Sequence, residues 1–215
     1  MSYVDPHRSG TTFGVVEFND IFAPNTSIDW GTIASDLDTV ICKVPFNDAN
    51  GDPLNAYHLL TAYKDATGNL HWYGPGVYMC FNADGSSDMQ MGDAVCVANS
   101  TPSAINSRPN IEFPSTTTDR EYPFGIVLEP IAQGGIGSVA MAGVWPAKRG
   151  SNTLAFQDHV LVDNSPVGCV FTASTDQTGA MGRTIALDYP IITDALGTTT
   201  NGGVILMWGT SRELY

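Results

Sequence analysis

The four histidines are the side chains best suited to metal or acid–base chemistry, and their spacing limits what they could do. His7, His58, His71 and His159 are scattered, and no two of them fit the HxH, HxxxH or HExxH spacing of a metal site. His58 and His71 lie nearly equidistant from the turn sequence at 65–68, so a hairpin there could place them on facing strands. Such a pair binds a metal only if a third ligand arrives, and polar histidines on a strand face are the simpler interpretation.

Three turn-like segments fit parts of known binding motifs. Residues 48–52 (DANGD) and 82–88 (NADGSSD) look like fragments of calcium loops, but neither has the downstream glutamate that an EF-hand requires. Residues 135–140 (GIGSVA) fit the GxGxxA pattern of a dinucleotide site, which needs a helix after the turn. The residues from 139 onward are strand-like instead, so hairpin turns explain all three segments.

Other catalytic motifs are missing from the sequence. It has no GxSxG elbow, no Cys–His spacing that suggests a protease and no close carboxylate pair that marks a glycosidase. Because triads also assemble from distant residues, missing motifs lower the expectation of an enzyme without abolishing it. We predict that the chain is not an enzyme and has no catalytic, cofactor-binding or metal-binding residues.

Aromatic side chains offer a different chemistry, because they stack on sugar rings and anchor protein interfaces. The chain has four tryptophans and eight tyrosines, and they include the cluster His71–Trp72–Tyr73. Packing in the core is the simpler expectation for any one of them. Exposed Trp72 and Tyr73, rimmed by Asp and Asn, would instead indicate a carbohydrate- or receptor-binding module.

Charge excludes one class of partner. The 22 acidic and 9 basic residues give a net charge of −13, so the chain lacks the positive footprint of a nucleic-acid binder. The apolar run Val204–Trp208 is too short to span a bilayer, and the first ten residues lack the pattern of a secretion signal. We therefore expect a soluble protein assembled in cytoplasm, with no nucleic-acid or membrane partner.

The spacing of the cysteines agrees with assembly in the reducing cytoplasm. Cys42, Cys80, Cys96 and Cys169 are widely spaced, form no CxxC pair and lie in apolar, strand-like stretches. Buried reduced thiols are the expected state in such surroundings, although the even number leaves disulfides open.

The elements that must position these residues are predicted to be strands. Charged residues make up only 14% of the chain, well below the usual share of about 25%. The 22 glycines and 13 prolines interrupt the sequence too often for long helices. We predict an all-β fold, with an antiparallel meander over 1–98 and a small β-barrel or sandwich module over 122–215. One short helix, capped by Ser27, is expected over Ile28–Leu37.

The segment between these regions, 99–121, has three prolines and many Ser, Thr and Asn residues. Little in it could form a ladder or a core. It is predicted to be an interdomain linker, an extended arm that packs on a neighbouring subunit, or a simple surface loop.

One stretch resembles a known class of proteins. Residues 124–147, FGIVLEPIAQGGIGSVAMAGVWPA, resemble a module of phage and prophage structural proteins of the form G-[IV]-x-L-x-x-I-A-x-G-x-x-G-x-V-x-x-x-G-V. In such head-decoration and head-fibre proteins the segment makes a hairpin in a small β domain. Here a strand would end at Ile131–Ala132, turn through the glycines and restart with Val139, Met141 and Gly143.

The resemblance implies a bacteriophage virion protein, most simply a capsid decoration (cement) protein or a head fibre on the outer head surface. It implies the major capsid protein as partner and a homotrimer as the assembled form. The alternative is a carbohydrate- or receptor-binding module such as part of a tail fibre.

The small, apolar and weakly charged hairpin is where we would place the trimer contact. Replacing Val144 by Asp is then expected to dissociate the oligomer. The candidate interface residues are Phe124, Ile126, Leu128, Ile131, Val139, Met141, Val144 and Trp145.

Overall fold

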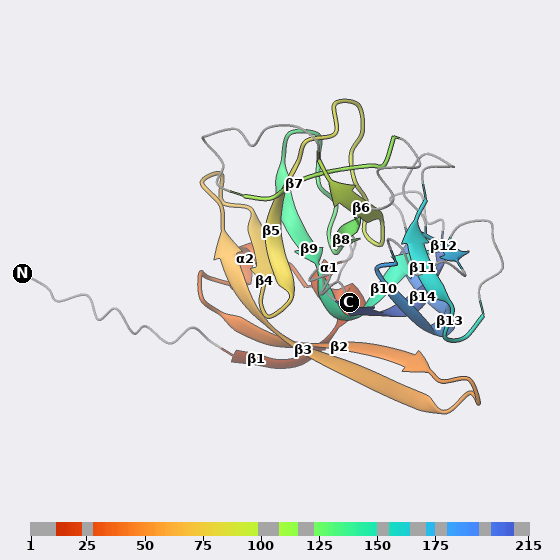
Figure 1. Cartoon of the computed structure of the whole chain (residues 1–215). Helices are drawn as coiled ribbons and strands as arrows, with labels where there is room; N and C mark the ends of the chain where they lie inside the picture. Colours follow the sequence, from red (N-terminus) through yellow and green to blue (C-terminus); the bar gives the residue numbers. More distant parts are fainter. Residues whose placement is uncertain are drawn as a thin grey trace, which may run out of the picture.

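The computed structural model describes residues 12–22, 28–98, 108–115, 123–149, 155–163, 171–174, 180–193 and 199–208. The structure is mostly β, with 57% strand and 7% helix, which confirms the all-β fold class. In the described part of the chain, no helix has the length and apolar character needed to cross a membrane. Figure 1 shows a four-stranded sheet along the lower side, a barrel above it and a second sheet beside the barrel.

The N-terminal sheet has the strand order β1-β2-β3-β4. Its strands are β1 (Thr12–Glu17), β2 (Thr39–Asn47), β3 (Pro53–Lys64) and β4 (Leu70–Tyr73). The turns between β2, β3 and β4 contain Gly51 and Gly68 at φ 86° and 90°, so these strands pair as antiparallel hairpins, as predicted. β1 pairs with β2 in parallel, because the chain crosses over between them. The sheet is therefore mixed rather than a simple meander.

The crossover between β1 and β2 carries the short helices α1 (Phe18–Phe22) and α2 (Trp30–Ile33). The cap of α2 is Asp29, whose Oδ1 accepts from the Thr32 backbone N–H at 3.2 Å and whose Oδ2 accepts from the Thr32 hydroxyl at 2.6 Å. Ser27 lies outside the described residues. The predicted helix over Ile28–Leu37 was too long, because Ala34 already has extended backbone and Leu37 has a φ of 69°.

A closed barrel of five short strands follows, in the order β5-β7-β6-β8-β9. Its strands are β5 (Val77–Asn82), β6 (Ala94–Val97), β7 (Asn110–Glu112), β8 (Pro123–Val127) and β9 (Ile136–Ala140). β7 lies inside the segment predicted as a linker, arm or loop, and it pairs with both β5 and β6. The barrel thus takes strands from all three predicted regions.

The segment that resembles the phage module forms the hairpin expected for it. β8 and β9 pair as antiparallel strands, with Ile126 opposite Ala140 and Val127 opposite Val139. The strand predicted to restart with Val139, Met141 and Gly143 is divided at Met141, where the chain leaves the barrel and enters the second sheet. The GxGxxA segment at 135–140 contains β9 and is followed by another strand, as predicted.

The second sheet has the order β10-β14-β13-β11-β12. Its strands are β10 (Ala142–Lys148), β11 (His159–Val162), β12 (Phe171–Ser174), β13 (Gly182–Thr193) and β14 (Thr199–Trp208). All its pairings are antiparallel. The region predicted as a single C-terminal module therefore contributes to both the barrel and this sheet.

One large hydrophobic cluster joins the three sheets. It includes the buried side chains of Leu60, Ile126, Trp145 and Val160, and a smaller cluster fills the barrel. The Lys148 Nζ lies 2.6 Å from the Asp93 Oδ1 and forms a buried ion pair between β10 and the barrel. Such shared burial makes the sheets depend on one another for stability.

The described cysteines are reduced, as expected. Cys42, Cys80 and Cys96 are buried thiols outside any disulfide, and Cys169 lies outside the described residues. Burial raises the pKa of Cys80 to about 12, so its thiol stays protonated and unreactive at neutral pH.

Candidate functional site

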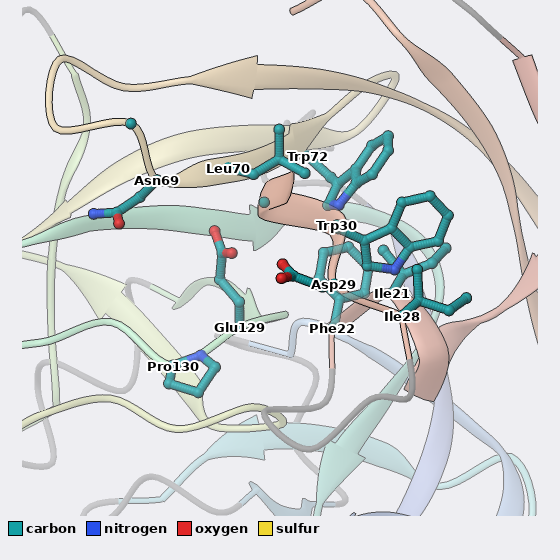
Figure 2. Close-up of a pocket in the computed structure, with 12 residues that line it drawn as sticks. Ile21, Phe22, Ile28, Asp29, Trp30, Asn69, Leu70, Trp72, Glu129 and Pro130 are labelled. Carbon is teal, nitrogen blue, oxygen red and sulfur yellow. The ribbon is translucent and has the colours of Figure 1, made fainter. Parts of the chain in front are cut away.

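A groove of about 560 Å³ lies between the N-terminal sheet and the barrel. One wall comes from the two helices and β4, and the other from Glu129 and Pro130 in the loop after β8. Figure 2 shows the carboxyl ends of Asp29 and Glu129 pointing into the space between α2 and that loop, while Trp30 and Trp72 line its apolar part. We call this the Trp30–Glu129 groove.

The two tryptophans of the groove are held in place by specific contacts. The Trp30 indole N–H donates to the Asp20 carbonyl at 2.7 Å, and its ring packs edge-on against Trp72 with centroids 5.4 Å apart. The Trp72 backbone N–H donates to the Ser138 hydroxyl of β9 at 3.1 Å. Trp72 is only 2% exposed, so it lacks the open face that stacking on a sugar needs, whereas Tyr73 is 36% exposed. Of the two aromatic side chains that would mark a sugar-binding module, only Tyr73 reaches the surface.

Asp65 organises the turn that borders the groove. Its Oδ1 accepts from the backbone N–H groups of Thr67 and Asn69, both at 2.9 Å, and from the Thr67 hydroxyl at 2.7 Å. Hydrogen bonds from Thr67, Asn69 and His71 hold the pKa of Asp65 far below its usual range. The side chain is therefore a fixed negative charge beside His71.

His71 joins two carboxylates that come from different parts of the fold. Its Nδ1 lies 2.8 Å from the Glu129 Oε1, and its Nε2 lies 3.4 Å from the Asp65 Oδ2. Ionised carboxylates only accept hydrogen bonds, and a neutral imidazole has a single N–H. The doubly protonated ring therefore matches this arrangement best. Burial opposes the charge of His71, but Glu129 and then Asp65 raise its pKa above the usual value.

Glu129 extends this connection into the barrel. The same Oε1 accepts from the Ser138 backbone N–H at 2.6 Å, so one carboxylate ties β4 to β9. A second cavity of about 530 Å³ lies beside the first and shares Asn69, Leu70, Glu129 and Pro130 with it. The described contacts of Asp29, Asp65 and Glu129 thus serve a cap, a turn and a link between sheets, respectively.

The histidine pair considered from the sequence does not form. The register of β3 and β4 places Tyr63, not His58, opposite His71. His58 instead stacks on Trp145 with ring centroids 3.8 Å apart, and its Nε2 lies 2.8 Å from the Val144 carbonyl. Burial lowers the pKa of His58, so the ring is neutral at pH 7 and donates to that carbonyl.

The oxygen-rich turns bind their own backbone. The Asp48 Oδ1 accepts from the N–H groups of Asn50 and Asp52 at 2.8 and 2.9 Å, and the Asp84 Oδ1 accepts from Ser86. These contacts are typical of turns in which Asp stabilises the backbone. Within the described ranges, no group of three His, Cys, Asp or Glu residues is placed to hold a metal ion.

The structure places most of the predicted interface residues inside the chain's own core. Six of the eight are at most 7% exposed: Phe124, Ile126, Leu128, Ile131, Val139 and Trp145. Met141 and Val144 are half-buried and pack against the two hydrophobic clusters. The six buried side chains have almost no surface to offer a second subunit, and the trimer itself stays a prediction.

Sequence reasoning missed a surface on the opposite side of the N-terminal sheet. Val15, Tyr57 and Leu59 are 55–57% exposed there. A signal for it is present in β3, where Leu59 and Leu60 are adjacent. Neighbouring residues of a strand point to opposite faces, so two adjacent leucines indicate apolar side chains on both.

Comparisons with protein-family models, with curated proteins and with solved structures give no match to this chain.

Proposed function

We propose that the chain is a structural component of a bacteriophage particle, either a capsid decoration protein or a head fibre on the outer surface of the head. The observation that carries the proposal is the hairpin of β8 and β9. It is formed by the stretch that resembles phage head modules, and it lies in a small closed barrel. The partner in this proposal is the major capsid protein.

The polar groups of the Trp30–Glu129 groove support a structural role. Asp29 caps a helix, and Glu129 links His71 to the backbone of Ser138. The Glu129 bonds connect the N-terminal sheet to the barrel, and a rigid connection between layers suits a protein that bears load on a lattice. Apolar strand residues exposed on the outer sheet face supply contact surface for assembly.

The test is quantitative mass spectrometry of particles purified from the source by density gradient. A copy number comparable with that of the major shell protein would support decoration, whereas a few copies per particle would support a fibre or tail part. If the chain stays in the soluble fraction while the shell protein sediments, the proposal fails.

A second candidate is a carbohydrate- or receptor-binding module, which the Trp30–Glu129 groove favours. A cavity of about 560 Å³ that is bordered by the carboxylates of Asp29 and Glu129 is large enough for a small polar ligand, which would bind through polar contacts because Trp30 and Trp72 are too buried to stack on a sugar ring. Titrating the full chain with a panel of sugars while recording tryptophan fluorescence tests this candidate, because Trp30 and Trp72 line the groove. A saturable change supports binding, and an unchanged spectrum with every sugar removes the candidate for that panel.

A further inference from the structure

The outer face of the N-terminal sheet carries a continuous apolar row. The register places Val15 of β1 beside Ile41 of β2, and Ile41 opposite Leu59 of β3. Val15 is 57% exposed, Ile41 half-buried and Leu59 55% exposed. Three aliphatic side chains from three adjacent strands thus lie side by side. Figure 1 shows these strands, β1 to β3, as the layer at the bottom of the view.

The next row on this face is polar but has no net charge. Glu17 lies beside Lys43, and their charged atoms are 2.8 Å apart. Tyr57, which is 57% exposed, is opposite Lys43 on β3. On a chain of net charge −13, this face therefore presents one negative and one positive group that neutralise each other.

The inner face of the same strands is already occupied by the chain's own core. Cys42 and Leu60 are adjacent in sequence to Ile41 and Leu59, and both are fully buried. Strands that carry apolar side chains on both faces are typical of sheets that are covered on both sides. On the outer face, no described residue covers the apolar row, since Val15 and Leu59 remain more than half exposed.

We propose that the row Val15–Ile41–Leu59, with the neutral pair Glu17–Lys43 and Tyr57 beside it, binds a second copy of this chain through the same face. This inference rests on the proposed structural role and names a partner for it. Two copies of an acidic chain repel each other over most of their surfaces, so they approach best through a face without net charge. A sheet face can pack on its own copy as the two layers of a β-sandwich do, with its apolar row inside.

The first test compares two apolar residues of similar exposure. Leu59→Asp places a charge in the centre of the face, and Val97→Asp does the same on β6 of the barrel, where Val97 is 49% exposed. We expect wild type and V97D to form a species heavier than one chain in sedimentation velocity over a wide concentration range. L59D should raise the dissociation constant about tenfold or more, because it removes a buried leucine from the contact.

The second test changes only the charge of the face. Lys43→Glu would leave two acidic side chains side by side and should also weaken association, more at low than at high salt. The exchanged pair E17K/K43E keeps the face neutral and should restore association. Thermal unfolding of each variant checks that the chain remains folded, so that a loss of association is not caused by misfolding.

Some outcomes would overturn the inference. A wild-type mass of one chain at every concentration would do so, as would an L59D variant that associates like wild type. Failure of the exchanged pair to restore association in a folded variant would contradict the charge argument. Particle mass spectrometry distinguishes failure of this inference from failure of the proposed function. A chain that is monomeric in solution but abundant in particles would contradict the self-association and still support the structural role.

Discussion

The β8–β9 hairpin with β10 and the β2–β3 hairpin are both rich in apolar residues, yet they place them differently. In the segment 124–147, six of the eight candidate residues lie in the core. In β3, Leu60 is fully buried while its neighbour Leu59 is 55% exposed. Apolar content alone therefore predicts that a segment is buried, but not what it is buried against. The alternation along the strand decides which side chains face the chain's own core.

The largest loss of stability is expected on substitution of Trp145, which lies in the buried segment. It is fully buried and stacks on His58 of β3. Trp145→Ala should lower the free energy of unfolding by about 3–5 kcal/mol, because it leaves a large cavity where the sheets meet. Urea unfolding measures this loss. A change below about 1 kcal/mol would contradict the burial of Trp145 in the core and would favour the predicted subunit contact.

The adjacent leucines of β3 give the sharpest form of the comparison. Leu60→Ala should cost about 2–5 kcal/mol in urea unfolding, since its side chain is fully buried. Leu59→Ala should change the stability of the single chain by no more than about 0.5 kcal/mol. Dilute protein is used so that association does not contribute. Equal losses in the two variants would contradict the assignment of the two faces.

Gly143 tests the junction between the two hairpins. Its φ of 107° favours glycine, and a Cβ there would lie 2.9 Å from His58 Cε1 and 3.0 Å from Trp145 Nε1. Gly143→Ala should therefore cost about 1–3 kcal/mol in thermal or urea unfolding. Gly51→Ala is the matched control, because its φ of 86° is also positive and nothing lies within 4 Å of its Cβ position. A loss no larger than that of the control would show that His58 and Trp145 do not meet there.

The smallest effect concerns pH and His71, which connects the N-terminal sheet to the barrel. Its pKa is raised in the folded chain, so its stabilising contribution is complete below its ordinary pKa of about 6.5 and is lost as pH rises through the folded value. Unfolding free energies measured across this range should fall more steeply with pH in wild type than in His71→Gln. Parallel curves would show that the two carboxylates do not favour the charged ring.

Local signals in the sequence predicted the parts of the fold that local contacts determine. The turns with Gly51 and Gly68 and the hairpin after β8 follow from glycine and Asx residues whose backbone preferences act over a few positions. The parallel pairing of β1 and the recruitment of β7 depend on contacts between distant segments. Three residues, Asn110–Glu112, in a Pro- and Ser-rich stretch give no periodicity from which to predict a strand.

The candidate site was harder to predict for the same reason. His71 and Glu129 are 58 positions apart, and only the folded barrel brings them within hydrogen-bonding distance. His58 had the right spacing for a partner across the turn, but the register of β3 and β4 placed Tyr63 there. The exposed face was detectable from Leu59 and Leu60, because strand geometry alone requires them to point apart.

The most direct test of the central claim, that the outer sheet face and not the 124–147 segment is the contact surface, is hydroxyl-radical footprinting of the full chain at high and low concentration. Tyr57 should be protected at high concentration in wild type and equally reactive at both concentrations in L59D. Tyr78 on the barrel is 49% exposed and should react in every sample, whereas fully buried Trp145 should react in none. Equal reactivity of Tyr57 at both concentrations, together with concentration-dependent protection of residues in 124–147, would contradict the account.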